Sequence, residues 1–172
     1  MIPKTMLTEV IQAMKRILLK IVLAAAAVFL FFNILWFAWS HIRYGAFSGG
    51  MEAAEFSNFI TPRYIYTDAD RYDFLVKYPD YLTFTGNMSV GLPATGERFF
   101  TDALIIWPKA GGKYELGVLL YDEDGSGYSV YIDSEGNALA GEDEEAVARH
   151  REHIQNLLMK ADERWGILDR HG

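Results

Sequence analysis

The feature that most constrains this chain is a run of twenty residues without a formal charge between Lys20 and His41: IVLAAAAVFLFFNILWFAWS. At ~1.5 Å per residue, a helix of this length is ~30 Å long, which matches the hydrocarbon thickness of a bilayer. Trp36 and Trp39 lie at its C-terminal end, where indole rings favour the membrane interface. The run therefore predicts a transmembrane helix over residues 20–40, rather than a buried helix of a soluble core.

The charges on either side of this run predict its orientation. Four Lys or Arg residues precede it, whereas Arg43 is the only one among the twenty residues that follow. Because cytoplasmic flanks are enriched in Lys and Arg, we expect residues 1–19 in the cytoplasm and the rest of this single-pass chain outside the cell membrane. A cleaved signal peptide is the alternative, since residues 46–48 resemble a cleavage site. That site, however, lies far beyond the apolar run, and the leading region is long.

Two short segments flank the predicted span. Residues 5–16 carry apolar side chains at helical spacing, which fits either a helix on the inner membrane surface or an extension of the span. Residues 41–60 form a juxtamembrane connector. Within it, Gly49–Gly50 marks a flexible point, and Met51–Phe59 fits a short helix.

Residues 61–172 are enough for one ordinary domain with its own core. The chain contains no cysteine, which excludes disulfides, thiolate metal sites and cysteine nucleophiles. The first twenty residues carry a net charge of +3 and the remainder −10, within a total of −7. Because an acidic domain repels the phosphate backbone, we expect no nucleic-acid partner.

A helix is predicted near the start of this domain, over Asp68–Lys77. Thr67 is a suitable N-cap, acids in the first turn complement the helix dipole, and Pro79 ends the helix. Its apolar side would consist of Phe74, Leu75 and Tyr78.

Period-two alternation then predicts four strands between Tyr81 and Ile132. The strands are expected at Leu82–Leu92, Phe99–Trp107, Tyr114–Leu120 and Tyr128–Ile132. Their short connections require antiparallel neighbours, which gives a four-stranded meander. The side chains expected on its core face include Leu82, Phe84, Val90 and Leu116.

A long helix is predicted over Glu142–Trp165, with four acids at its N-terminal end and Gly166 after its last turn. The face that would cover the sheet consists of Val147, Ile154, Leu157, Leu158, Ala161 and Trp165. The predicted fold class is therefore α+β: an N-terminal transmembrane helix, then a small domain with a four-stranded antiparallel meander flanked by two helices. A helix followed by such a meander is similar in outline to cystatin-like domains, and this likeness of element order implies no function.

The acidic turn at residues 122–127 is the most suggestive motif in the chain. With Asp122 at position one, Asp124, Ser126 and Asp133 occupy ligand positions of an EF-hand calcium loop. Position twelve is aspartate instead of the usual bidentate glutamate, and the flanks are predicted strands where an EF-hand has helices. We therefore interpret the motif as a β-hairpin turn and expect it not to bind calcium.

Two further clusters have ordinary structural explanations. Asp68, Asp70 and Asp73 lie at a predicted helix start, where the dipole favours acids whatever the function. His150 and His153 are spaced to clamp a metal, but no third ligand is indicated, so we interpret them as one partly buried and one solvated histidine. The sequence thus indicates no catalytic, cofactor-binding or metal-ligating residues.

The leading hypothesis is a non-enzymatic, membrane-tethered extracytoplasmic binding or accessory module, with the lipid bilayer and a membrane or envelope protein as partners. It rests on the anchor, on the lack of a catalytic motif and on tyrosines numerous enough to form a recognition patch. These tyrosines, which half-burial at sheet and helix edges would also explain, are Tyr64, Tyr66, Tyr72, Tyr78, Tyr81, Tyr121, Tyr128 and Tyr131. The alternatives are an extracytoplasmic sensor or carrier domain for calcium or a small ligand and, third, a carboxylate-dependent hydrolase.

Overall fold

The structure, a computed structural model, describes residues 4–55, 57–93, 100–121 and 127–168, and the chain divides into two compact units, 1–39 and 40–172. Helix α1, Lys4–Gly45, forms the first unit and contributes its last turn to the second. From Ile11 onward it is long and apolar enough to cross a membrane, and its most apolar stretch is exposed throughout; a signal sequence has the same properties. The apolar stripe at residues 5–16 is part of this one helix and does not form a separate one.

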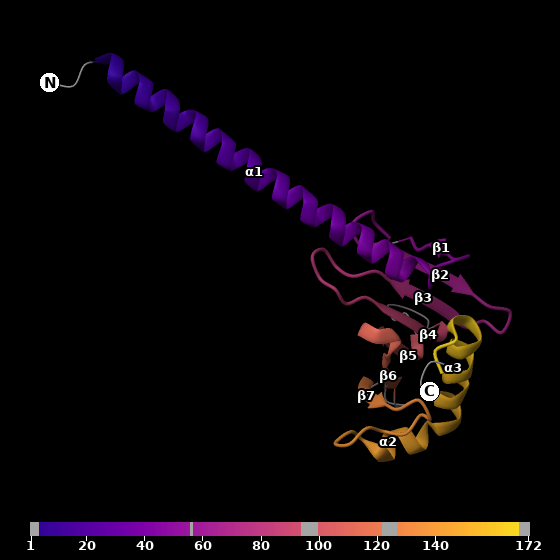
Figure 1. Cartoon of the computed structure of the whole chain (residues 1–172). Helices are drawn as coiled ribbons and strands as arrows, with labels where there is room; N and C mark the ends of the chain where they lie inside the picture. The colour runs from indigo at the N-terminus through magenta and orange to yellow at the C-terminus, as the bar shows by residue number, and fades with distance from the viewer. Residues whose placement is uncertain (1–3, 56, 94–99, 122–126, 169–172) are drawn as a thin grey trace. The chain divides into compact units, whose positions relative to one another are not determined.

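The second unit is built on a seven-stranded antiparallel meander in which every strand pairs with its sequence neighbours (Figure 1). The strands are β1 Glu52–Ala53, β2 Arg63–Thr67, β3 Asp73–Lys77, β4 Asn87–Pro93, β5 Phe100–Pro108, β6 Tyr114–Tyr121 and β7 Gly127–Ile132. A short 3-10 turn, Ala110–Gly112, connects β5 to β6. The α+β class and the antiparallel meander are confirmed, but the sheet has seven strands where the sequence predicted four.

Two of the three additional strands, β1 and β3, replace predicted helices, and β2 lies where no element was predicted. The segment Asp68–Lys77 forms a turn and strand β3, because Arg71 has a φ of 67°, which no right-handed helix accommodates. Asp68 does act as a cap, but in a turn: its Oδ1 accepts the backbone N–H of Tyr72 at 2.8 Å. The short helix expected at Met51–Phe59 is also wrong, since strand β1 pairs with β2 there. Because residues 68–77 form no helix within the domain, the outline shared with cystatin-like domains does not apply.

The first predicted strand of the meander begins too early. Strand β4 starts at Asn87, whereas residues 81–85 form a loop in which Leu82 has a φ of 59°. Phe84, expected in the core, is 67% exposed. The other two residues assigned to that core face, Val90 and Leu116, are buried as predicted.

The predicted C-terminal helix is two helices, α2 Glu144–Arg149 and α3 Arg151–Trp165, with a break at His150, whose φ and ψ of −102° and 12° are not helical. Asp143 caps α2 by accepting the backbone N–H of Ala146 at 2.8 Å. Gly166 ends α3 in the left-handed conformation, as expected. All six apolar side chains predicted to cover the sheet are buried.

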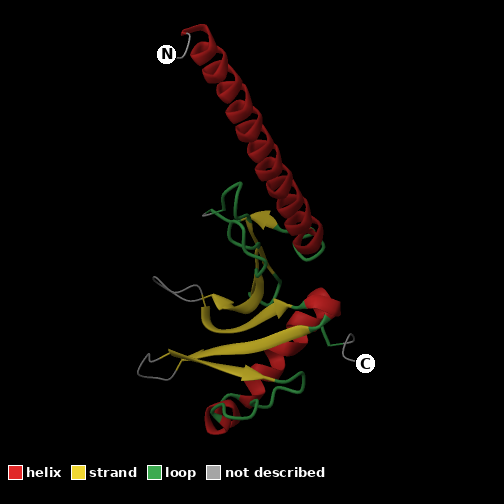
Figure 2. Cartoon of the chain, turned by 60° about the vertical axis from the view of Figure 1, so that its left-hand side comes forward, coloured by secondary structure: helices red, strands yellow, loops and turns green. Residues whose placement is uncertain are grey.

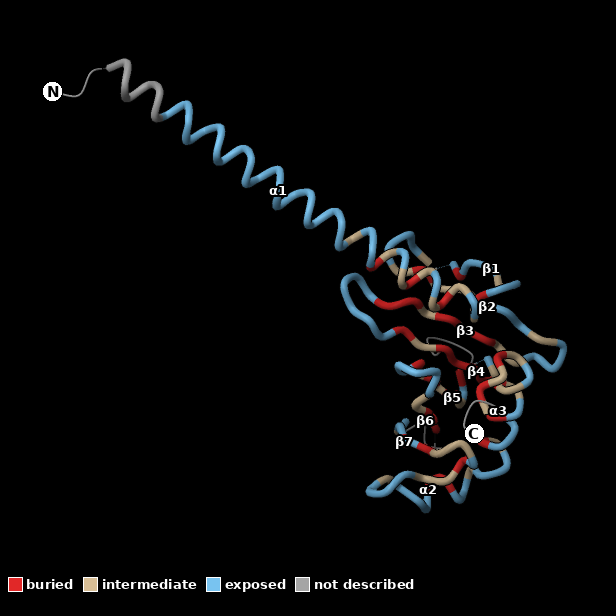
Figure 3. Tube along the Cα trace, viewed as in Figure 1, coloured by how far each residue is buried: buried red, intermediate tan, exposed pale blue. Residues whose placement is uncertain are grey.

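The core lies between α2 and α3 and one face of the sheet (Figure 2), and the buried segments follow the central strands (Figure 3). Leu104 and Ile106 of β5 and their neighbours Val90 and Val118 are fully or almost fully buried on this face. Phe74 of β3 contacts the ring of Trp165 edge-on at 5.5 Å. Together with the buried hydrophobic side chains of α3, these residues form a core that excludes water.

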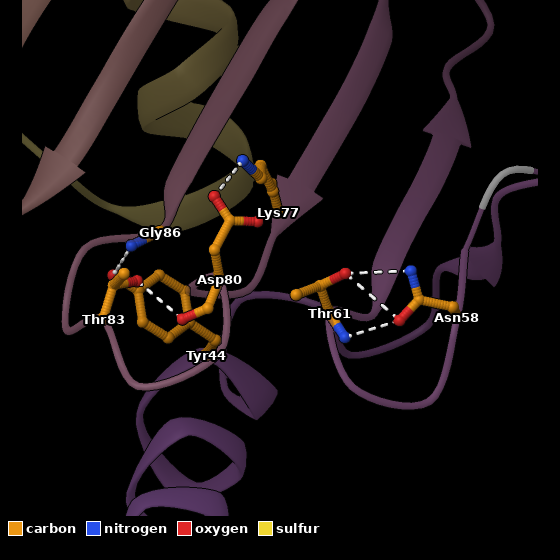
Figure 4. Close-up of polar contacts among 7 residues, drawn as sticks. All are labelled: Tyr44, Asn58, Thr61, Lys77, Asp80, Thr83 and Gly86. Atoms are coloured by element: carbon orange, nitrogen blue, oxygen red, sulfur yellow. Dashed lines mark hydrogen bonds and ion pairs between the residues drawn. The ribbon is translucent and has the colours of Figure 1, made fainter.

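The last turn of α1 is an integral part of this second unit. Tyr44 is completely buried, its ring lies 5.6 Å from that of Tyr78, and its Oη accepts the backbone N–H of Gly86 at 2.8 Å (Figure 4). The hydroxyl of Tyr78 in turn lies 3.1 Å from that of Ser48. Burial raises the pKa of Tyr78, against the effect of the Ser48 hydrogen bond. The juxtamembrane residues expected to form a flexible connector are therefore packed into the domain at this point.

Candidate binding surface on the open face of the sheet

The alternation that buries one face of the meander places a second set of side chains on the opposite face. One cross-strand row of this second face runs from β2 to β7 and comprises Ile65, Leu75, Ser89, Ile105, Gly117 and Tyr131. Within the described part of the chain, both C-terminal helices lie against the other face (Figure 2). The row is therefore the middle of a partly exposed sheet face, on which Ser89 and Gly117 are buried, Ile65, Leu75 and Ile105 are half-buried, and Tyr131 is exposed.

A hollow of about 160 Å³ lies on this open face, between Ile105, Trp107, Gly117, Ser129 and Tyr131. The rings of Trp107 and Tyr131 are 5.8 Å apart at an interplanar angle of 43°. Gly117 lies beneath the indole, since a Cβ added there would come within 3.0 Å of the ring. The glycine thus lets the indole lie flat against the sheet, and the hollow forms beside it.

Such a hollow suits an apolar or aromatic side chain of a partner. Trp107 and Tyr131 present large, rigid ring surfaces whose burial costs little conformational entropy, which is why these residue types carry much of the binding energy at interfaces. Tyr131 is 42% exposed and available to a partner. Ser129 and Tyr131, which both line the hollow, carry hydroxyl groups suited to orienting a bound group.

The three aspartates singled out in the sequence take part in ion pairs and turns. Lys160 of α3 makes ion pairs with Asp68, at 3.1 Å, and with Asp70. The hydrogen bonds to Asp70 and Asp68 raise the pKa of Lys160. Asp73 accepts the hydroxyl of Thr67 at 2.6 Å across the β2–β3 hairpin. The cluster therefore joins this hairpin to α3 and does not converge on a ligand.

The two histidines have different partners. The Nε2 atom of His153 lies 3.6 Å from Oδ2 of Asp102, and both side chains are mostly buried, so His153 is not the solvated residue that the sequence indicated. His150 lies at the break between the helices, with its Nε2 3.4 Å from the hydroxyl of Tyr128. The described residues contain no group of three or more His, Cys, Asp or Glu side chains arranged to hold a metal ion.

The EF-hand-like motif lies largely outside the described residues, which omit 122–126. Its last ligand position, Asp133, belongs to a separate turn. Oδ1 of Asp133 accepts the backbone N–H groups of Glu135, at 3.0 Å, and of Asn137, at 2.8 Å. Burial favours the protonated form of this carboxyl, but these hydrogen bonds outweigh it, and the pKa of Asp133 is lowered.

A second hollow, of about 440 Å³, lies between residues 109–116 and 132–139. Its lining combines the cations Lys109 and Lys113 with the acids Glu115 and Asp133. Lys109 and Glu115 form an ion pair at 2.7 Å, which neutralises part of this charge. The rest of the lining is mainly apolar and includes Leu116, Ile132 and Leu139, so the hollow suits a small molecule with both an apolar body and a charged group.

Sequence analysis did not identify the Trp107–Gly117–Tyr131 arrangement. Tyr131 was included among the candidate recognition tyrosines, but Trp107 was assigned only to the predicted strand Phe99–Trp107 and to no surface. A signal was present: Gly117 interrupts a strand whose neighbours are apolar, and an isolated glycine in a strand marks a close approach by another group.

The chain matches no protein-family model, no curated protein and no solved structure.

Proposed function

We propose that the chain is a membrane-tethered, non-enzymatic binding module that presents the open face of its sheet to a protein partner outside the cell. The observation that carries this proposal is the hollow bounded by Trp107 and Tyr131 over Gly117, on a sheet face that no described helix covers. Exposed aromatic side chains around a small concavity are the usual centre of a protein interface.

The proposal includes retention of α1 as a single-pass anchor. Cleavage near residues 46–48 would remove Tyr44 from the second unit, although its side chain is completely buried there. The loss would leave the backbone N–H of Gly86 without this acceptor and a cavity beside Tyr78. An uncleaved helix avoids both costs, and the four cations before the apolar run favour a cytoplasmic N-terminus.

Site-specific photocrosslinking in native membranes tests the binding proposal. A photoreactive amino acid at Tyr131 should crosslink to one specific protein, and Trp107→Ala in the same chain should abolish the product. The matched control is the same amino acid at Met159, an equally exposed apolar position on α3, which should give no such product. Equal products from both positions, or persistence in the Trp107→Ala chain, would exclude the open face as the binding surface.

The mass of the protein recovered from membranes tests the anchor independently. Full-length mass, resistance to carbonate extraction and protease sensitivity of the domain only from the outer side are expected. A soluble protein that begins after residue 48 would exclude the anchor while leaving the crosslinking result open.

The second candidate function is a sensor or carrier domain for a small charged ligand, favoured by the hollow between Lys109, Lys113, Glu115 and Asp133. Fluorescence-monitored melting of the full-length protein with dicarboxylates, inorganic phosphate and calcium tests it. A concentration-dependent rise in melting temperature that Lys113→Ala removes would favour this function over the first.

A further inference from the structure

Two turns of the second unit lie at the end of the sheet that receives the last turn of α1. Arg63 pairs with Lys77, and Lys77 with Asn87, so the segment before β2 and the loop between β3 and β4 occupy the same end. The backbone N–H of Tyr78 donates to the carbonyl of Pro62 at 3.0 Å, and Tyr44 of α1 accepts from Gly86. Figure 4 shows Asn58 and Thr61 on one turn and Asp80 and Thr83 on the other.

Polar residues at their ends hold both turns in place. In residues 58–61, Oδ1 of Asn58 accepts the backbone N–H groups of Ile60, at 3.0 Å, and of Thr61, at 2.8 Å. In residues 80–83, the carbonyl of Asp80 accepts both the backbone N–H of Thr83, at 2.8 Å, and its hydroxyl, at 2.7 Å. Each turn thus presents its two central residues at a fixed tip.

The central residues of both turns are apolar or aromatic: Phe59 and Ile60 in one, Tyr81 and Leu82 in the other. Phe59 is 79% exposed, and the other three are exposed by about half. Phe84, in the same loop as the second turn, is also largely exposed. Turn tips ordinarily carry Gly, Pro, Asn, Asp or Ser, so two neighbouring turns with apolar tips indicate a surface that is not left in water.

Leu82 adds an independent observation. Its φ of 59° lies in the left-handed region, where glycine or asparagine fits without strain and leucine does not. An exposed leucine at such a position costs folding free energy and contributes no core packing. A leucine at this position is explained if its side chain is buried in lipid or in another protein.

In the anchored topology, helix α1 holds these turns close to the bilayer. Ser40 is the last residue of the apolar run, and Tyr44 lies one helical turn further on, about 6 Å along the axis. The loop at residues 80–84 leads into Gly86, which donates to Tyr44, and the turn at residues 58–61 precedes Pro62, which accepts from Tyr78. Both turns are thus joined to the residues that directly follow the proposed span. Ile42, on the same turn of α1, is 79% exposed, and Arg43 beside it donates to the carbonyl of Lys109.

We propose that the turns at residues 58–61 and 80–84 dock on the outer surface of the bilayer and insert their apolar tips among the lipid headgroups and upper acyl chains. The proposal rests on the anchored topology proposed above. The occupant is lipid, because the same chain enters the bilayer next to this surface and because aromatic and aliphatic side chains at fixed loop tips are suited to the membrane interface. Docking fixes the tilt of the second unit and with it the direction in which the open sheet face points.

Spin labelling of the full-length protein in phosphatidylcholine–phosphatidylglycerol vesicles tests the proposal. The chain has no native cysteine, so single nitroxides can be attached at one chosen site each. The docking positions are Ile60→Cys and Phe84→Cys. Met159→Cys on α3 is the matched exposed apolar control, and Leu30→Cys in α1 marks the hydrocarbon interior. Power saturation with oxygen and a water-soluble nickel chelate then reports the depth of each label.

The expected result is oxygen-rich, nickel-poor environments at positions 60 and 84, shallower than position 30, and a water-like environment at position 159. Leu82→Ser combined with the label at position 60 should shift that label toward water. If the label at position 30 is accessible to oxygen as in lipid, but the labels at positions 60 and 84 are accessible to nickel as in water, docking is overturned and the anchor remains. Water-like values at 30 would overturn the anchor itself. Shielding of 60 and 84 from both reagents would mean that protein covers them and would also overturn docking.

Discussion

The hydroxyl oxygen of Tyr44 accepts a hydrogen bond from the backbone N–H of Gly86, 42 residues away in the sequence, at 2.8 Å. The first residue belongs to the last turn of α1 and the second to the loop that precedes β4. This bond and the packing of Tyr44 against Tyr78 make the end of the apolar helix part of the core of the second unit. The fold of that unit is consequently sensitive to changes around these residues.

Gly86→Ala should destabilise the protein by about 1–3 kcal/mol, because the site is already filled. A Cβ at this position would come within 2.3 Å of the carbonyl of Lys77 and 2.9 Å of the Tyr44 ring. Gly49→Ala is the matched control, since nothing lies within 4 Å of its added Cβ, and its effect should stay within about 0.5 kcal/mol. Urea denaturation of the detergent-solubilised chain measures both, and equal midpoints would contradict the packing described here.

Phe84→Ala should change the free energy of unfolding in detergent by no more than about 0.5 kcal/mol, because the side chain is 67% exposed. Met88→Ala, four residues later and fully buried on β4, should cost about 2–5 kcal/mol. The same denaturation experiment compares the two variants. A large loss of stability in Phe84→Ala would show that Phe84 lies in the core, as the sequence predicted.

Arg71→Asn should stabilise the protein by up to about 1 kcal/mol, because Arg71 adopts a φ of 67° that asparagine tolerates better. The variant should not disturb the turn, which is held by Asp68 through its bonds with Tyr72. Arg149→Asn, at an exposed site inside α2, provides a control that should lower stability slightly. A loss of stability in Arg71→Asn would show that the arginine side chain contributes more than its strained backbone costs.

Asp133→Asn should flatten the acid limb of the stability profile. The pKa of Asp133 is lowered in the folded protein, because hydrogen bonds from Asn137 and Glu135 outweigh the effect of burial. The unfolded chain therefore binds the proton more readily, and the carboxylate stabilises the fold above its ordinary pKa of about 4 and ceases to do so as the pH falls below it. Melting temperatures between pH 7 and pH 3 should show the wild type losing more stability than the variant, and parallel curves would refute the linkage.

Sequence patterns located the later strands well and the earlier elements poorly. The predicted strands at residues 99–107, 114–120 and 128–132 agree within one residue at each end with β5, β6 and β7, because one of their faces is fully buried and the alternation is strong. Residues 68–77 begin with residue types that cap helices, but Asp68 caps the turn of the β2–β3 hairpin instead. Local propensity cannot separate these two uses when the deciding contact, Lys160 to Asp68, comes from 92 positions further along the chain.

The misplacement at residues 81–85 has a different cause. Leu82 and Phe84 alternate with Thr83 and Thr85 in the same way as a half-buried strand does, but the loop exposes its apolar residues. An alternating pattern indicates which side chains are apolar and suited to burial. It does not show whether they are buried in a protein core or in another apolar environment. The candidate surface on the sheet was missed because Trp107 and Gly117 are brought together only by the β5–β6 register.

The indole N–H of Trp165 donates to the carbonyl of Phe47 at 3.0 Å, and Arg164 donates to the carbonyl of Gly49. These bonds join positions more than a hundred residues apart, whereas every strand pairs with the one made just before it. During synthesis the meander can therefore assemble strand by strand as it emerges, with short loops to close at each step. Its buried face nevertheless stays uncovered until α2 and α3, which follow all seven strands in the chain, can pack on it, so a chain that lacks these helices exposes that apolar face.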